Sequence, residues 1–189
     1  MNKEEASIVQ ESTKNILQVI EGTPILREEL VETPNRVVRA YEELFDGYHI
    51  DIPELFRTFE EGDDQLVLSK DIPFISWCEH HVLPFIGTVS VAYLPKKNRV
   101  IGASKIPRLV SAYAHRLQIQ ERLARQIADD MMKYLEPHGV AVIIKAKHSC
   151  IAYRGIKSEG TELVNSIMLG AFRESSELRN ELLLLGLKA

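Results

Sequence analysis

The run VAVIIKAKHSCIAYR, residues 140–154, constrains the fold more than any other segment. Its β-branched residues predict one long strand. Two stretches with helical spacing precede it, at residues 107–117 and 120–137, and the β-rich run TELVNSIMLGAF follows it at 161–172. This order of elements indicates an α+β chain.

The remaining segments extend this prediction. The first fifty residues carry apolar side chains at helical spacing and predict a helical hairpin. Short β-rich runs at 66–77 and 87–95 predict further antiparallel strands, and SELRNELLLLGL at 176–187 predicts a closing helix. We therefore expect an N-terminal helical region over 1–60 and, over 61–189, an antiparallel sheet with helices on one face.

Composition limits the classes of function. The chain has 189 residues, of which 45% are hydrophobic, enough for one full core. A net charge of -4 gives no global field that attracts nucleic acid. Two cysteines are too few for a disulfide framework, which favours a reduced, cytoplasmic location. No apolar run is long enough for a membrane span or a signal peptide, so neither is expected.

Both cysteines stand beside histidines, in CEHH at 78–81 and in HSC at 148–150. Thiolate and imidazole are the ligands that tetrahedral zinc prefers. The spacing of Cys78 and His81 lets one turn direct both at an ion, whereas the adjacent His80 must diverge. On a strand, His148 and Cys150 project from the same face. We therefore predict Cys78, His81 and Cys150 as ligands with an open fourth position, which is typical of a catalytic zinc.

Simpler interpretations exist for each residue alone. A single cysteine is usually a small buried hydrophobe, and a single histidine usually an ordinary hydrogen-bonding residue. The pairing of both cysteines with histidine is what favours a metal site. Glu79 is either a partner of a ligand or a solvated turn residue, and the sequence does not decide between these.

A second group of polar residues lies in VIGASKIPRLV, where a strand gives way to a helix. Ser104, Lys105 and Arg108 meet backbone N–H groups at the start of that helix, which suits a phosphate. Arg154 follows Cys150 by an even number of strand positions and is expected on the same face. Basic residues at helix starts are more often simply solvated, but these lie close in sequence to the metal candidates.

A third group stands at the start of the helix QERLARQI. Gln120 and Glu121 either face a pocket or belong to a solvated face on which Glu121 pairs with Arg125. The residues alone leave both interpretations open.

Five motifs in this order resemble the GTP cyclohydrolase I family: CEHHVLPFIGTVSVAYLP, VIGASKIPRLV, RLQIQERLARQIAD, GVAVIIKAKHSC and RGIK followed by NSIMLGAF. The resemblance covers about residues 66–185 and includes TPNR near Thr33. It implies the same zinc ligands, with His80 and His148 as catalytic residues. It also implies that Glu121 anchors the guanine and that Ser104, Lys105, Arg108 and Arg154 bind the triphosphate, and Gln120 is expected among the substrate-binding residues.

The resemblance further implies a tunnelling fold, with a four-stranded antiparallel sheet and two long helices per chain. The family forms homodecamers with active sites between subunits. Its reaction is the zinc-dependent conversion of GTP to 7,8-dihydroneopterin triphosphate with release of formate, the first step of pterin and tetrahydrofolate-type biosynthesis. Neither nucleic acid nor membrane is an expected partner. Ser149, Ala103 and Ala124 depart from the family's usual residues, as does the stretch 151–153, and these departures affect pocket shape.

Two other functions fit parts of this pattern. A tunnelling-fold nitrile reductase uses a cysteine nucleophile without zinc, but the three-ligand set and the lack of a nicotinamide-binding signature disfavour it. A non-catalytic purine-binding oligomer with a structural zinc would have no use for His80 and His148.

Overall fold

The computed structural model describes residues 1–60 and 65–187. The chain forms two compact units, Met1–Asp46 and Gly47–Ala189. The boundary predicted after residue 60 adjoins residues 61–64, which lie outside the described residues, and it stays a prediction.

The first unit contains two helices, α1 (Lys3–Glu21) and α2 (Thr33–Leu44), joined through a 3-10 turn at Glu28–Leu30. Asn2 caps α1 by accepting a hydrogen bond from the backbone of Glu5, whose side chain in turn accepts from the backbone of Asn2. The helices meet through the Gln10 amide, which donates to Asn35 Oδ1 at 2.8 Å. No residue of α1 is buried, so this unit has little core of its own.

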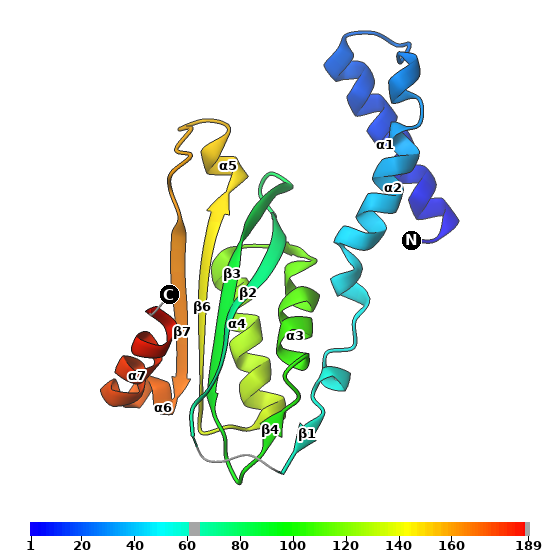
Figure 1. Ribbon diagram of the computed structural model, residues 1–189. Helices are drawn as coiled ribbons and strands as arrows, with labels where there is room; N and C mark the ends of the chain where they lie inside the picture. The colour runs from blue at the N-terminus through cyan, green and yellow to red at the C-terminus, as the bar shows by residue number, and fades with distance from the viewer. Residues whose placement is uncertain (61–64, 188–189) are drawn as a thin grey trace. The chain divides into compact units, whose positions relative to one another are not determined.

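The second unit is built on a five-stranded sheet in the order β5-β2-β3-β6-β7 (Figure 1). Its four long strands are antiparallel neighbours: β2 (Val67–Cys78), β3 (Leu83–Leu94), β6 (Gly139–His148) and β7 (Leu163–Gly170). The fifth strand, β5 (Leu117–Gln118), has two residues and runs parallel to β2. A separate pair is formed by β1 (Thr58–Phe59) and β4 (Val100–Ile101).

Helices cover both faces of this sheet, although the sequence predicted one face. The larger core lies between the sheet and two helices, α3 (Lys105–Ala114) and α4 (Gln120–Asp130), the latter continued by a π-helical turn at Met131–Leu135. On the other face, a smaller cluster joins Ala92 and Ala141 of the sheet to Phe172 and Leu182. These two come from α6 (Ala171–Glu174) and α7 (Ser176–Leu187).

The remaining elements are short. They are α5 (Ser149–Ala152) and 3-10 turns at Asp46–His49 and Pro53–Leu55. Among the described residues, no helix combines the length and the apolar character needed to cross a membrane.

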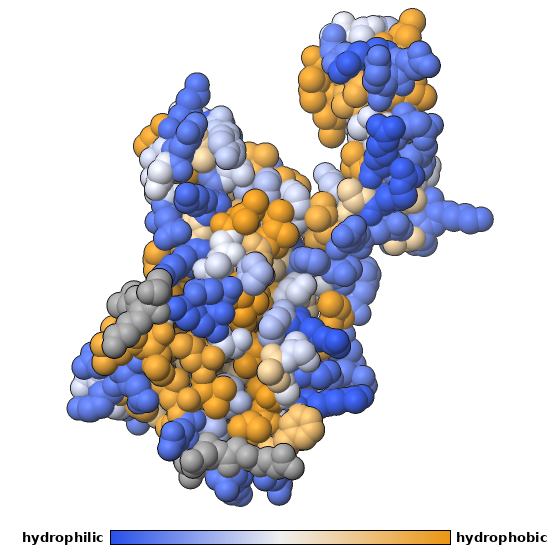
Figure 2. Space-filling view, viewed as in Figure 1, coloured by the Kyte–Doolittle hydropathy of each residue, from blue (hydrophilic) through white to orange (hydrophobic). Residues whose placement is uncertain are grey.

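The surface of the second unit carries a large apolar area where the sheet and α7 lie (Figure 2). Several aliphatic side chains there are exposed: Val164, Leu183, Leu184 and Leu185. Because contiguous apolar patches on a protein surface usually mark contacts, this area is a candidate interface.

Candidate functional site

Cys78 lies at the end of β2, where the chain turns into β3. The backbone N–H groups of His81 and Val82 both donate to the Cys78 carbonyl, at 3.2 and 2.8 Å. Val82 has φ of 52°, a left-handed conformation that is rare for a β-branched residue. The tight turn places Cys78 and His81 together, so that Cys78 Sγ and His81 Nδ1 are 3.8 Å apart.

Cys150 arrives from β6, but not as a strand residue. The predicted strand to residue 154 is wrong: β6 ends at His148 and Cys150 lies in α5. The last pair between β3 and β6 is Phe85 with His148. The next residue of β3 is Pro84, which has no N–H to continue the ladder. Cys150 and Arg154 are therefore placed by a helical turn and the loop after it, not by strand alternation.

The structure nevertheless brings the three predicted ligands together. The ligand atoms of Cys78, His81 and Cys150 all lie within 4.8 Å of one another. A tetrahedral zinc with Zn–S of about 2.3 Å and Zn–N of about 2.0 Å holds its ligand atoms roughly 3.5 to 3.8 Å apart. Small side-chain movements are enough to reach that spacing. Burial, and then the nearby Cys78 thiol, raise the pKa of Cys150. The donor set and its spacing fit a metal of zinc type.

Two other contacts describe the histidines of the turn. His80 Nδ1 is 3.7 Å from Cys78 Sγ, but the side chain is exposed and the group that includes Cys150 contains His81 instead. Arg154 Nη1 donates to His81 Nε2 at 2.7 Å. In that arrangement a neutral His81 carries its proton on Nδ1. Binding a metal through Nδ1 would move the proton to Nε2, and Arg154 would have to turn away.

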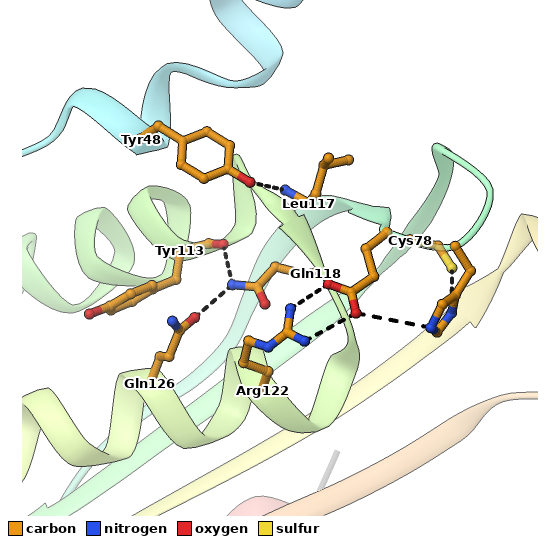
Figure 3. A network of polar contacts seen from close by, with 9 residues as sticks. Tyr48, Cys78, Tyr113, Leu117, Gln118, Arg122 and Gln126 are labelled. Carbon is orange, nitrogen blue, oxygen red and sulfur yellow. Dashed lines mark hydrogen bonds and ion pairs between the residues drawn. The ribbon is translucent and has the colours of Figure 1, made fainter.

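Glu79 forms an ion pair with Arg122 of α4, so it is not simply a solvated turn residue. Arg122 donates to its two carboxylate oxygens at 2.5 and 3.0 Å (Figure 3). This hydrogen bond lowers the pKa of Glu79. The backbone N–H of Glu79 also donates to the Gln118 carbonyl at 3.0 Å, and Cys78 pairs with Gln118 in the sheet. The ligand turn is thus joined to the start of α4.

His148, at the end of β6, is half-buried beside this turn. Its ring stacks on Phe85, with centroids 4.6 Å apart and planes 3° from parallel. Burial lowers its pKa, and the Glu121 carboxylate partly offsets this. A pocket of about 230 Å³ is lined by Ile86, Lys147, His148, Ser149, Ala152, Tyr153 and Glu159. Three residues predicted to depart from the family's usual ones, Ser149, Ala152 and Tyr153, therefore lie at this pocket.

The two residues at the start of α4 differ in their surroundings. Gln120 is 2% exposed, and its amide oxygen is 2.9 Å from His148 Nε2. Glu121 is exposed, and Arg125 pairs with Asp129 at 2.8 Å. The interpretation in which Arg125 holds Glu121 is therefore not the arrangement found. Glu121 lies close enough to His148 to act on its charge.

The predicted phosphate residues are not brought to the metal candidates within one chain. Ser104 precedes α3, and Lys105 and Arg108 lie in its first turn. α3 begins beside β4, at the opposite end of the sheet from the β2–β3 turn (Figure 1). A helix of this length spans about 15 Å. In the described chain only Arg154 of this predicted group lies at the metal candidates.

Three residues of the site were not predicted: Phe85, Arg122 and Asn165. Asn165 accepts a hydrogen bond from the Gln120 amide at 2.8 Å. The sequence does carry a signal for Asn165, because it is the polar residue that interrupts the otherwise apolar face of a strand. Arg122 has no such signal, since its partner Glu79 is 43 residues away in sequence.

Comparison with known proteins agrees with the motifs. The family model described as GTP cyclohydrolase I matches residues 9–186. The GTP cyclohydrolase 1 of Caldanaerobacter subterraneus is 46% identical over 178 residues, covering 94% of each chain. That of Thermoanaerobacter pseudethanolicus is 47% identical over 176 residues, covering 93% of each chain.

A solved structure of an archaeosine synthase QueF-Like is 22% identical, with a TM-score of 0.45, and covers 58% of this chain and 97% of its own. That likeness is too low to carry weight. The family match and the two relatives span nearly the whole sequence, from the N-terminal helices to α7. The chain belongs to the GTP cyclohydrolase I family of hydrolases.

Proposed function

We propose that this chain converts GTP to 7,8-dihydroneopterin triphosphate with release of formate, as a zinc enzyme with the tunnelling fold. The observation that carries the proposal is the convergence of Cys78, His81 and Cys150 beside His148 in a chain of this family. All proposed site residues fall within 61–189. Two free thiols suit a reducing compartment, which supports a cytoplasmic location.

Cys78, His81 and Cys150 are the proposed zinc ligands, in agreement with their spacing and donor types. Zinc held by these three residues would lower the pKa of a coordinated water to near neutrality and so would supply a nucleophile at neutral pH. The residues around the ligands then decide where that chemistry is applied.

His148 and His80 are the proposed proton-transfer residues. His148 is half-buried next to a pocket, so it is placed to protonate the guanine imidazole nitrogen as the ring opens. His80 is exposed on the ligand turn, which suits proton transfer at the ribose oxygens during the rearrangement that follows. Neither histidine is needed to hold the ion.

Glu121 is the proposed guanine reader. It is exposed at the start of α4 and close to His148. Its carboxylate can accept from the guanine N1–H and the 2-amino group. Adenine lacks both donors and would leave the carboxylate unpaired, which favours GTP over ATP.

Assembly is proposed to complete the triphosphate site. Ser104, Lys105 and Arg108 lie far from the ligand cluster of their own chain, so a neighbouring subunit has to supply them. The exposed aliphatic area near α7 supports association between chains. A homodecamer with sites between subunits, as in the family, meets both requirements. Arg154 would join this group once it leaves His81.

The test is incubation of the zinc-loaded protein with GTP while formate and pterin fluorescence are measured together. We expect equimolar formate and dihydroneopterin triphosphate, and no product from ATP. Cys150→Ser serves as the matched inactive control. Formate absent from the wild-type reaction, with zinc present by elemental analysis, would contradict the proposed activity.

A further inference from the structure

A buried hydrogen-bond network lies behind His148. The amide nitrogen of Gln120, the first residue of α4, lies within hydrogen-bond distance of three oxygens, which share its two N–H donors. They are Ile144 O at 3.2 Å, Leu163 O at 3.1 Å and Asn165 Oδ1 at 2.8 Å. Its amide oxygen lies 2.9 Å from His148 Nε2. The network thus connects α4, β6 and β7 to a single imidazole.

The three oxygens fix which way the Gln120 amide points. Turning the amide over would place its oxygen against three acceptors, which is unfavourable in a buried site. The amide oxygen therefore faces His148. Because an amide oxygen only accepts, His148 Nε2 must donate to it. A neutral His148 consequently carries its proton on Nε2 and its lone pair on Nδ1.

The plane of the ring is fixed as well. Phe85 is paired with His148 across β3 and β6 and stacks on it at 4.6 Å. A stacked ring and a directed hydrogen bond together leave one ring nitrogen for chemistry. Glutamine at this position acts on His148 as a buried partner acts on the histidine of a catalytic triad, by choosing its tautomer.

We propose that Gln120, held by Asn165, is a positioning residue that locks His148 in the Nε2–H tautomer, so that Nδ1 is the nitrogen that exchanges a proton with the substrate. This rests on the proposed function, in which His148 is a proton-transfer residue. The proton on His148 Nε2 stays there throughout, donated to the amide oxygen of Gln120. The side chain of Gln120 then acts through His148 and is not a guanine ligand.

Kinetics separate positioning from substrate binding. In Gln120→Met we expect kcat to fall by roughly 10- to 100-fold, as when other orienting partners of active-site histidines are removed. Zinc content and the Kd for GTP, measured by calorimetry, should stay near the wild-type values. A guanine ligand would instead show weaker GTP binding. An unchanged kcat overturns the inference. Weakened GTP binding also overturns it.

Gln118 offers a matched control. It is also a buried glutamine, 1% exposed, whose amide donates to Tyr113 O at 3.0 Å and Gln126 Oε1 at 2.8 Å (Figure 3). Gln118→Met removes a comparable buried amide without touching His148, so its kcat should stay close to that of the wild type. An equal loss of kcat in both variants would mean that general destabilisation explains the effect, and the proposal would fail.

Histidine tautomers can be observed directly. Solid-state NMR of the zinc-loaded protein with ¹⁵N,¹³C-histidine should show a neutral Nε2–H form that disappears in His148→Phe. Gln120→Met should convert it to a mixture of tautomers. An Nδ1–H form in the wild type that disappears in His148→Phe refutes the inference. If Gln120→Met does not fold, Asn165→Leu removes the 2.8 Å acceptor and should show the same change to a smaller extent; an unaltered spectrum and kcat there also refute it.

These readouts also separate this inference from the proposed function. A wild-type protein that releases no formate contradicts the activity, yet its spectrum still decides the tautomer. An active wild type with an unaffected Gln120→Met variant contradicts only the positioning role.

Discussion

The turn that holds Cys78 and His81 and the start of α3 both carry clustered polar side chains. Among the described residues, only those of the turn are in contact with other polar residues of the proposed site within one chain. Around the ligand turn, α4 makes hydrogen bonds to Glu79 and to His148 of β6, and the ligand atoms of Cys78 in β2 and Cys150 in α5 lie within 4.8 Å of each other. At the start of α3, Ser104 makes no capping hydrogen bond and Arg108 is exposed. The difference teaches that one chain brings together the proposed metal and guanine residues, while its proposed phosphate residues Ser104 and Arg108 are exposed.

The largest effect is expected from changing a proposed zinc ligand. Cys150→Ser should reduce zinc from about one ion per chain to almost none, because a hydroxyl is a poor replacement for a thiolate ligand of zinc. Activity should be lost with the ion. Elemental analysis of matched fractions checks this, and full zinc in the variant would remove Cys150 from the ligand set.

A pair of histidine variants divides the metal side into ligand and proton-transfer residues. His148→Ala should keep its zinc and lose about 10²- to 10⁴-fold in kcat, as expected when one positioned acid is missing. His81→Ala should lose both zinc and activity. The two variants must differ in zinc content. A zinc-free His148→Ala together with a fully loaded His81→Ala would exchange the roles of these histidines.

Changing Glu121, the proposed guanine-binding residue, should have a smaller effect, on GTP affinity alone. Glu121→Gln should bind GTP roughly 10- to 100-fold more weakly, the usual loss for hydrogen bonds to a charged group. Zinc should be retained. Arg125→Gln, which changes an exposed charge one turn further along α4, is the control and should bind GTP normally. Calorimetric affinities that are equal for Glu121→Gln and the wild type would place the guanine elsewhere.

Mixing variants tests the comparison itself. Cys150→Ser and Arg108→Ala should each have little activity, but their co-expression should restore about a quarter of the wild-type level if sites form between chains at random. Mixtures of Cys150→Ser with His81→Ala damage the same side and should restore none. Differently tagged chains allow mixed assemblies to be purified and assayed. No recovery in the first mixture would argue against a shared site.

The sequence predicted the elements better than their joints. Residue types at helical and strand spacing indicated β6 and α7, because those patterns reflect burial that is local to each element. The end of β6 at His148 was missed, since it depends on Pro84 in another strand. Cover on the second sheet face was missed for a similar reason: it depends on Phe172 and Leu182 packing across the chain.

The site divides in the same way. The grouping of Cys78, His81 and Cys150 was predicted, because both cysteines stand beside histidines in the sequence. The partners that orient them were not. Arg122 reaches Glu79 across 43 positions, and Gln120 reaches Asn165 across 45, so no local pattern reports either contact. Long-range side-chain pairs require the tertiary structure to be known.

The two-residue strand β5 has a consequence for how this protein can change. Through backbone pairs with Trp77 and Cys78, it sets the distance from the ligand turn to Glu121. Backbone groups are common to nearly all amino acids, so most substitutions along this connection leave the spacing intact. In the proposed site, nucleobase preference can therefore be redesigned at Glu121 while the spacing of the proposed metal ligands persists. A lineage that changes its substrate need not rebuild its ion site.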